Sequence, residues 1–258
     1  MIPISYSGAK DARNASRPVL VLGARSDIAR ALAHELAARG HPLQLAARDA
    51  AGLERDAADF ALRHGVEVTT HDFDATRPDT FAGFLTDLPA VPRIVISAVG
   101  LMGDQEANAA DPALAERVIA TNFTGPALFL EEAARRLAVL DAPTALIGIS
   151  SVAGDRGRAR NYVYGAAKAG FTAYLSGLRQ KYAREPLLVM TVRPGFVATA
   201  MTEGMDLPEK LTTSPEALAG RIVKALDKRR PVHVDPLWRL IMGIITHLPE
   251  RLFMRLRF

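Results

Sequence analysis

Residues 19–29 are Val-Leu-Val-Leu-Gly-Ala-Arg-Ser-Asp-Ile-Ala, and they indicate the class of fold. Val19–Leu22 is apolar on both alternating faces, which is typical of a strand covered on both sides of a parallel sheet. Asp27–Arg39 follows as a helical stretch that ends before Gly40, a residue suited to a helix C-terminus. A strand that runs through a glycine turn directly into a helix begins a βαβ unit.

The rest of the chain repeats this alternation of short aliphatic runs and longer amphipathic stretches. Further strands are predicted at Leu43–Ala46, Val66–Thr69, Ile94–Ser97, Leu146–Ile149, Leu188–Val192 and Val232–Val234. A second helix is predicted to end at Gly65. The pattern predicts an α/β fold: a Rossmann-like, doubly wound parallel sheet of about seven strands with right-handed crossovers and helices on both faces. We expect one domain over residues 18–235, with a flexible arm at 1–17 and an amphipathic extension at 236–258.

Composition excludes several classes of protein. The 258 residues are 49% hydrophobic and 23% charged, which excludes wholesale disorder. Cysteine is absent, which removes disulfide scaffolds and cysteine nucleophiles and is compatible with the cytoplasm. The net charge of +4 is too small to indicate nucleic acid, and Met1–Arg17 lacks the apolar core of a signal peptide. No metal is expected, because ligand spacing is missing among His34, His41, His64, His71, His233 and His247.

Positive charge is concentrated near the C-terminal end. From Arg221 to Phe258 nine Lys or Arg oppose three Asp or Glu, a balance of +6, so the rest of the chain sums to −2. Leu237–Leu248 is apolar, but it is too short for a membrane span of about 20 residues. The segment 236–258 could contact the inner face of a membrane, wall a tunnel for an apolar chain, pack across an oligomer interface or cover a cleft. A solvated basic face is the simpler alternative.

The turn Gly23-Ala24-Arg25-Ser26-Asp27-Ile28-Ala29 presents backbone amides at the positive end of a helix dipole, where a pyrophosphate is a natural ligand. Asp27 places a negative side chain near those phosphates, and its alternative role is the N-cap of the helix. After the second strand, Ala46-Ala47-Arg48 lacks the acidic residue that would accept hydrogen bonds from a ribose diol. Arg48, with Arg25 approaching, could instead bind a 2′-phosphate, which favours NADP over NAD. Otherwise Arg48 simply caps a strand in solvent.

Tyr164-Gly165-Ala166-Ala167-Lys168 carries a second chemical signal. Residues four apart share a helix face, so phenol and ammonium should lie side by side. A neighbouring ammonium stabilises phenolate and would lower the pKa of Tyr164, which makes it a general acid near neutral pH. Ser151 lies thirteen residues upstream at a strand end, and its hydroxyl could hold a carbonyl oxygen beside the phenol. The alternative is a solvent-facing Tyr–Lys pair.

In this order, the Gly23 turn, Asn122-Phe123-Thr124-Gly125, Ser151-Val152-Ala153-Gly154, Tyr164-x-x-x-Lys168 and Arg193-Pro194-Gly195 resemble the motifs of short-chain dehydrogenases/reductases. The similarity covers about residues 18–201 and implies a Rossmann fold and hydride transfer with NAD(P). It also implies roles: Tyr164 donates and accepts the proton, and Ser151 orients the carbonyl. Lys168 lowers the Tyr164 pKa and binds the nicotinamide ribose, and Asn122 positions a water in the proton relay.

The resemblance also implies where a cofactor would bind, with NADP(H) preferred and NAD(H) possible. The expected contacts are Gly23, Arg25, Ser26, Asp27, Ile28, Arg48, Asp72, Phe73, Ala98, Val99, Gly100, Tyr164, Lys168, Pro194, Gly195, Val197 and Thr199. Asp72 resembles an acidic residue that contacts adenine, although it could equally cap a loop. Two departures affect this geometry: Ser97-Ala98-Val99-Gly100 replaces the usual Asn-Asn-Ala-Gly, and Asp27 and Ala29 replace two usual glycines.

A narrower resemblance concerns the substrate. Gly100–Asp104, Ser150–Gly170 and Leu237–Phe258 are similar to decaprenylphosphoryl-2-keto-ribose reductases, the reductase half of an epimerase system, which implies a lipid-linked 2-keto pentose. The alternatives are a small soluble ketone or hydroxy compound as the substrate, or a nucleotide-binding partner protein with vestigial chemistry. Against the latter, the set Asn122, Ser151, Tyr164 and Lys168 is complete. The apolar segment after Thr199 is a candidate substrate lid, and a homo-oligomer is expected.

Overall fold

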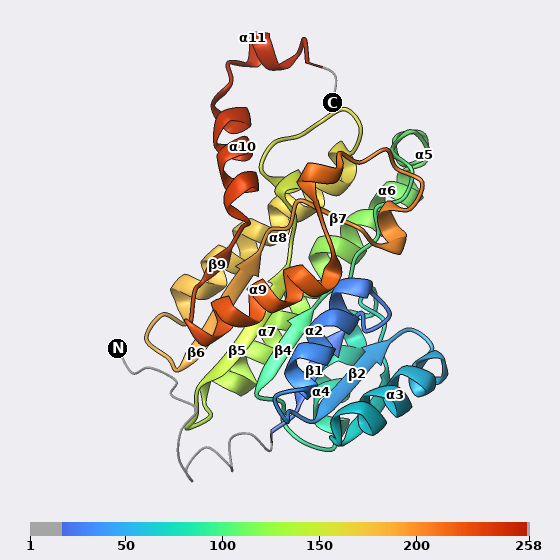
Figure 1. The fold of residues 1–258 in the computed structure, drawn as a ribbon, viewed down its shortest axis with the longest axis vertical. Helices are drawn as coiled ribbons and strands as arrows, with labels where there is room; N and C mark the ends of the chain where they lie inside the picture. Colours follow the sequence, from blue (N-terminus) through green and yellow to red (C-terminus); the bar gives the residue numbers. More distant parts are fainter. Residues whose placement is uncertain (1–16, 257–258) are drawn as a thin grey trace.

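A parallel sheet forms the centre of the protein, whose computed structural model describes residues 17–256 (Figure 1). Seven strands of this part have the order β3-β2-β1-β4-β5-β6-β9. They are β1 Val19–Leu22, β2 Leu43–Ala47, β3 Val68–Asp72, β4 Ile94–Ser97, β5 Thr144–Ile149, β6 Leu187–Val192 and β9 Val232–His233. The strand order reverses between β1 and β4, and in doubly wound sheets the crevice at this point binds ligands. The arm predicted at 1–17 falls, except for Arg17, outside the described residues.

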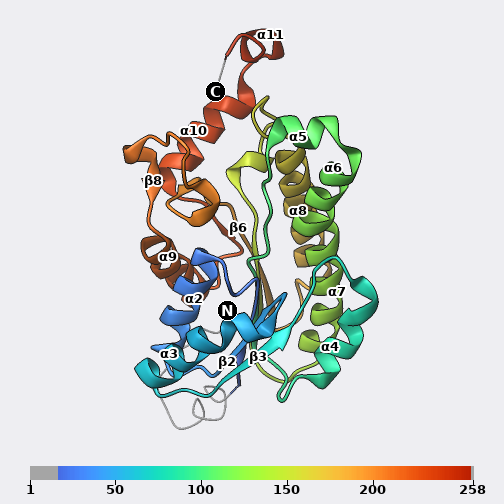
Figure 2. The same cartoon turned by 90° about the vertical axis from the view of Figure 1, so that its right-hand side faces the viewer.

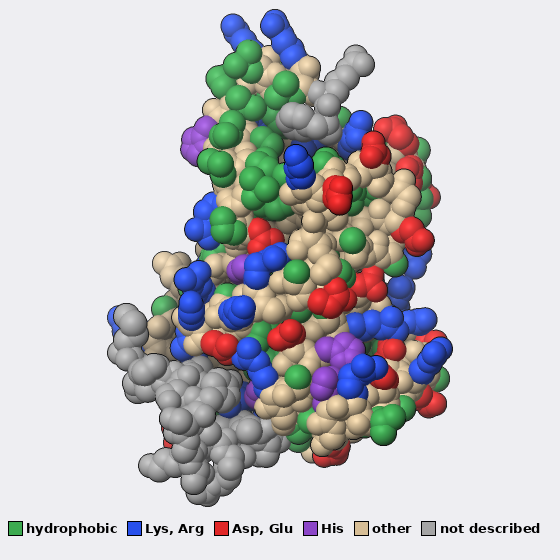
Figure 3. Space-filling view, in the orientation of Figure 1, with side chains coloured by type: hydrophobic (Ala, Val, Ile, Leu, Met, Phe, Trp, Pro, Cys, Tyr) green, Lys and Arg blue, Asp and Glu red, His purple; other side chains and the backbone are tan. Residues whose placement is uncertain are grey.

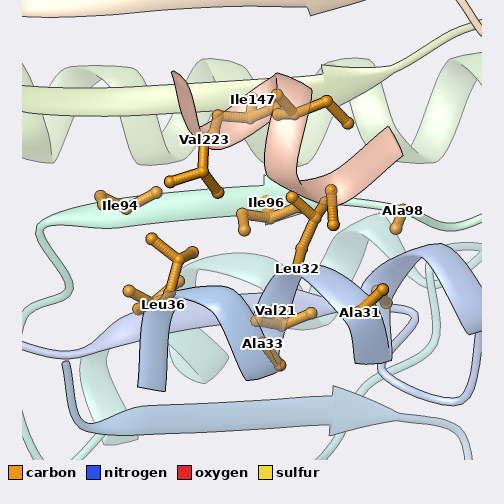
Figure 4. Packing of buried hydrophobic residues seen from close by; sticks show 14 of the residues in the cluster. Val21, Ala31, Leu32, Ala33, Leu36, Ile94, Ile96, Ala98, Ile147 and Val223 are labelled. Atoms are coloured by element: carbon orange, nitrogen blue, oxygen red, sulfur yellow. The ribbon is translucent and has the colours of Figure 1, made fainter. Parts of the chain in front are cut away.

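Helices cover both faces of the sheet (Figure 2). One face carries α2 Asp27–Ala37, α3 Glu54–His64 and α9 Pro215–Asp227, and the other carries α4 Phe81–Asp87, α7 Gly125–Ala138 and α8 Tyr162–Lys181. Alternate strand residues point to opposite faces, so Ile96 and Ile147 pack with Leu32 of α2 and Val223 of α9 (Figure 4). The predicted Rossmann-like, doubly wound sheet with helices on both faces is confirmed.

Shorter elements surround the carboxyl edge of the sheet. They are α5 Gln105–Ala110, α6 Pro112–Ile119, the π-helical turn η3 Ala120–Thr124, η4 Val152–Gly154, β7 Phe196–Val197, η5 Ala200–Thr202, η6 Glu209–Leu211, β8 Thr212–Thr213, α10 Pro236–His247 and α11 Glu250–Phe253. Two further turns, η1 Ala50–Leu53 and η2 Pro78–Thr80, follow β2 and β3. Among the helices within residues 17–256, none combines the length and apolar character needed to cross a bilayer.

Most predicted boundaries agree with the structure, and the exceptions have physical causes. β1 and β4 match, and Gly40 and Gly65 adopt φ of 82° and 66°, the left-handed region that glycine favours. The prediction for β3 was wrong by two residues at its start and by three at its end, because pairing with β2 runs from Val68, opposite Leu43, to Asp72, opposite Ala47. This edge strand is only partly buried, which weakens its hydrophobic pattern. The paired β7 and β8 are too short for periodicity to reveal.

Candidate active site

Gly23 shapes the loop after β1. Its φ of 75° lies in the left-handed region, and a Cβ there would be 2.9 Å from the backbone of Ala98 and Val99. Glycine is therefore required for two reasons, the turn itself and the close approach of the loop after β4. The result is a narrow crevice between the carboxyl ends of β1 and β4.

The N-terminus of α2 opens into this crevice. Within residues 17–256 the backbone N–H groups of Asp27 and Ile28 have no hydrogen-bond acceptor, as expected for the first turn of a helix. The N-cap prediction for Asp27 was wrong: Ser26 occupies that position, and the Asp27 carboxylate accepts a 2.8 Å hydrogen bond from the backbone N–H of Ala200. The Asp27 carboxylate is thus bonded to the segment after β7. The backbone amides at the start of α2 therefore remain available to an anion.

A cleft of about 640 Å³ follows from this arrangement. Of the predicted cofactor contacts it is lined by Gly23, Arg25, Ser26, Asp27, Ile28, Arg48, Phe73, Ala98, Val99, Gly100 and Thr199. The exposed guanidinium groups of Arg25 and Arg48 lie at its rim, and Arg25 is 3.7 Å from the carboxylate of Asp49. Free helix amides, a glycine crevice and two rim arginines fit a phosphorylated dinucleotide.

Other predicted cofactor contacts do not line this cleft. They are Asp72, Tyr164, Lys168, Pro194, Gly195 and Val197. Asp72 accepts a 2.7 Å hydrogen bond from the backbone N–H of Ala50, the loop-capping alternative. Gly195 packs against the indole of Trp238, leaving no room for a Cβ, and Val197 is buried in β7. Contacts from these residues to a cofactor stay predictions.

Three of the predicted catalytic residues, Ser151, Tyr164 and Lys168, lie at the end of β5 and on α8. The phenol of Tyr164 lies beside the side chain of Ser151, the N-cap of η4, and interacts with it. Lys168 lies one helical turn further along α8, with its Nζ 5.7 Å from the centre of the Tyr164 ring. The Lys168 side chain is buried, and its Nζ donates a 3.0 Å hydrogen bond to the carbonyl of Ile149. The helical spacing therefore places the two side chains on one face, as predicted.

The predicted direction of the Tyr164 pKa was wrong for this structure. Burial raises the pKa of Tyr164 to about 12, and the neighbouring Ser151 side chain offsets this only in part. Burial also lowers the pKa of Lys168 to about 7, so the amine holds much less positive charge near the phenol than an exposed lysine would. The prediction assumed that the Lys168 charge would lower the pKa of Tyr164. In the structure, the burial of both side chains has the larger effect on that pKa. At neutral pH the phenol carries its proton.

Asn122 lies in the π-helical turn η3, an irregularity that often marks functional sites. Its fully buried amide donates to the carbonyls of Leu101 and Val118, at 2.5 and 2.8 Å, and accepts from the N–H of Leu101 at 3.2 Å. Leu101 also lines the cofactor cleft, so Asn122 connects that wall of the cleft to Val118 of α6. The role in a water relay stays a prediction.

Ser150 contributes to the site in a way that was missed from the sequence. The hydroxyl of buried Ser150 donates a 3.0 Å hydrogen bond to the carbonyl of Lys168 and thereby anchors α8 on β5. Met201 lines the cleft and reaches Gly100, where an added Cβ would be 3.3 Å from its Cε. The Ser150-Ser151 pair at a strand end was a usable signal for Ser150. Met201 belongs to the segment after Thr199 that was predicted as a substrate lid, and the structure places it at the wall of the cleft.

The strand order, the glycine turn and the Ser–Tyr–Lys group together define a dinucleotide-type α/β enzyme. The sequence model of the short chain dehydrogenase family matches residues 17–210, and the chain belongs to this family. An uncharacterised oxidoreductase of Streptomyces coelicolor is 37% identical over 96% of this chain and 98% of its own. One from Mycobacterium tuberculosis is 34% identical over 93% and 96%. The protein is accordingly an oxidoreductase of this family.

A solved structure supports the same conclusion. A short-chain dehydrogenase from Sphingobium yanoikuyae, described in complex with NADPH, superimposes with a TM-score of 0.74 at 25% identity. The match covers 90% of this chain and 97% of that one. The shared architecture extends over nearly the whole of both chains.

Proposed function

We propose that the protein reduces a ketone to a secondary alcohol with NADPH. The observation that carries this proposal is the adjacent pair of Ser151 and Tyr164 side chains, with buried Lys168 on the same helix face as Tyr164. The pair lies at the carboxyl edge of the sheet, and the cofactor cleft lies at this same edge. Serine and tyrosine hydroxyls at one point provide two hydrogen-bond donors for a single carbonyl oxygen.

The protonation state of Tyr164 favours the reductive direction. A bound nicotinamide nucleotide supplies the hydride. The Ser151 hydroxyl holds the carbonyl oxygen, and the Tyr164 phenol donates a proton to that oxygen as negative charge develops on it. Because the pKa of the phenol is raised to about 12, the proton is present at neutral pH and no prior protonation is needed. Oxidation of an alcohol would require the phenolate, which burial disfavours.

Several features support NADP(H) over NAD(H). Arg25 and Arg48 line the rim of the cleft next to the end of β2, and an acidic residue is missing at the end of that strand. A guanidinium group matches a 2′-phosphate in geometry and charge. The relative from Sphingobium yanoikuyae is described with NADPH. Asp49, beside Arg25, is a local negative charge that leaves some scope for NAD(H).

A lipid-linked 2-keto sugar is the finer proposal for the substrate. It rests on the narrower resemblance and on the apolar character of the lid and the C-terminal segment, where Met201, Met205 and Leu240 are 44%, 48% and 64% exposed. The two bacterial relatives are described only as oxidoreductases, and these descriptions give no substrate. A small soluble ketone is the alternative.

Consumption of NADPH and NADH with a panel of ketones tests both levels of this proposal. The panel pairs a polyprenyl-phosphate-linked 2-keto pentose with soluble ketones at matched concentration. Preference for the lipid-linked sugar supports the finer proposal, and turnover on soluble ketones alone would retain the reaction and remove that substrate. If NADPH binds but no ketone is reduced, the nucleotide-binding partner alternative gains support. Equal or better turnover with NADH would contradict the cofactor preference.

A further inference from the structure

The last described part of the chain, here called the C-terminal arm (residues 236–256), extends away from the body of the protein (Figures 1 and 2). It consists of α10 and α11 joined by a short turn. We propose that the C-terminal arm docks the enzyme on an anionic lipid surface. The proposal goes beyond the reaction above, because docking requires neither a cofactor nor a ketone.

One face of α10 anchors the arm to the body. Trp238 and Met242 are buried with Val152 and Val234, and the indole N–H of Trp238 donates a 3.1 Å hydrogen bond to the carbonyl of Leu211. Phe196 meets the Trp238 ring edge-on, with ring centres 5.0 Å apart. These contacts bury the inner face of α10 and fix the direction of the helix.

Arg156, in the loop after η4, holds the far end of the arm. Its guanidinium donates hydrogen bonds to the carbonyls of Ile245 and Leu248, at 2.6 and 2.7 Å, and pairs with Glu250 at 2.8 Å. The same group lies 3.8 Å from the centre of the Phe253 ring. A planar guanidinium with this many partners keeps α11 in a defined position.

The outer face of the arm is apolar and exposed. At 100° per residue, Leu237, Leu240 and Ile244 lie on one side of α10, away from the buried pair. The exposed apolar side chains are Leu237 at 48%, Leu240 at 64%, Ile244 at 59%, Leu252 at 52%, Met254 at 76% and Leu256 at 46%. Figure 3 shows hydrophobic side chains gathered along the projecting part of the molecule. A contiguous apolar surface of this kind marks an interaction site.

Charge identifies the partner. Arg239, Arg251 and Arg255 are exposed on the arm, and within residues 17–256 none of them has an ion-pair partner. Glu250, the single acidic residue of the arm, is paired with Arg156. A second copy of the arm would bring like charges together, whereas anionic headgroups complement them and the acyl region accepts the leucines and isoleucine.

The C-terminal arm lies at the same edge of the sheet as the catalytic group. The loops after β5 and β6 leave the carboxyl edge of the parallel sheet, and the arm follows β9 at that same edge. A surface contacted by the arm would therefore lie on the side of the molecule that carries Ser151 and the segment after Thr199. A substrate embedded in or released from that surface would meet the catalytic side first.

Flotation with vesicles tests the inference on the full chain without cofactor or substrate. We expect recovery with vesicles of phosphatidylcholine and phosphatidylglycerol but not with pure phosphatidylcholine, and weaker binding at high salt. Substituting Arg251→Gln together with Arg255→Gln should lower partitioning about 30-fold, since each arginine near such a surface contributes roughly fivefold. Leu240→Gln with Ile244→Gln should also weaken binding.

Matched controls lie on α3, at a distance from the arm. Leu62→Gln replaces a side chain that is 90% exposed, and Arg55→Gln removes an exposed arginine; both should float like the unaltered protein. Circular dichroism checks that each variant is folded. Equal flotation of arm and control variants, or no flotation of the unaltered chain, would overturn the inference. A loss of oligomerisation in Leu240→Gln with Ile244→Gln, without a change in flotation, would overturn it in favour of a second copy. Each of these failures would leave the proposed reduction standing.

Discussion

Lys168 in the catalytic group is 3% exposed, whereas Leu240 in the C-terminal arm, at the same edge of the sheet, is 64% exposed. Removing an amine from water and leaving a leucine in water both cost free energy, so neither arrangement is explained by folding. The two regions depart from the usual distribution of side chains in opposite directions. Such departures are expected at functional sites, here a chemical site and an interaction surface.

The largest effect is expected in the catalytic group. Tyr164→Phe removes the proton donor and should lower NADPH-dependent ketone reduction about 10³-fold, within the range for general acid catalysis. The binding of NADPH, measured by fluorescence titration, should be retained. Tyr162→Phe is the matched control, because Tyr162 lies two residues away and is 47% exposed. Similar turnover in both variants would remove Tyr164 from the mechanism.

Lys168→Met should lower turnover and raise the stability of the fold. Turnover should fall on the order of 10²-fold. Burial lowers the folded pKa of Lys168 to about 7 from 10.5, so between these values the unfolded chain binds more protons and stability rises with pH. The destabilising effect of the amine is greatest below about pH 7. Calorimetry should therefore show a higher Tm for Lys168→Met at pH 6, with a smaller gain at pH 9. A lower Tm at both pH values would contradict this account.

Arg48→Ala examines the rim of the cofactor cleft. Loss of a charge-assisted contact to a 2′-phosphate should weaken NADPH binding roughly 10- to 100-fold and leave NADH binding unchanged. Titration of both nucleotides measures the difference, with Arg55→Ala on α3 as a control. Unchanged NADPH affinity would show that Arg48 only occupies solvent at the end of β2.

The smallest effect concerns the attachment of the arm. Arg156→Ala removes hydrogen bonds to two carbonyls and the ion pair with Glu250, so we expect a loss of about 2 kcal/mol in the stability of the arm. Cleavage by a protease near Leu248 should become faster. Arg160→Ala, four residues along the same loop, should leave the cleavage rate unchanged. Equal rates in both variants would show that the inner face of α10 alone holds the arm.

Local patterns predicted much of the fold and part of the site. The spacing of Tyr164 and Lys168 places them on one helix face in any fold, and the apolar runs of β1 and β4 require burial on both sides. The bond between Asp27 and Ala200 joins residues 173 positions apart, so local sequence does not indicate it. The pKa of Tyr164 was also inaccessible, because it depends on burial by the assembled structure.

Transfer of deuterium from NADPH to a ketone tests directly whether the protein is a ketone reductase. NADPH labelled with deuterium at the reactive C4 position of the nicotinamide would be incubated with a ketone that the enzyme consumes, and the alcohol analysed by mass spectrometry. We expect one deuterium on the carbinol carbon from the unaltered protein and from Tyr162→Phe, and hardly any product from Tyr164→Phe. NADPH binding without transfer of the label to any ketone would contradict the assignment of a reductase.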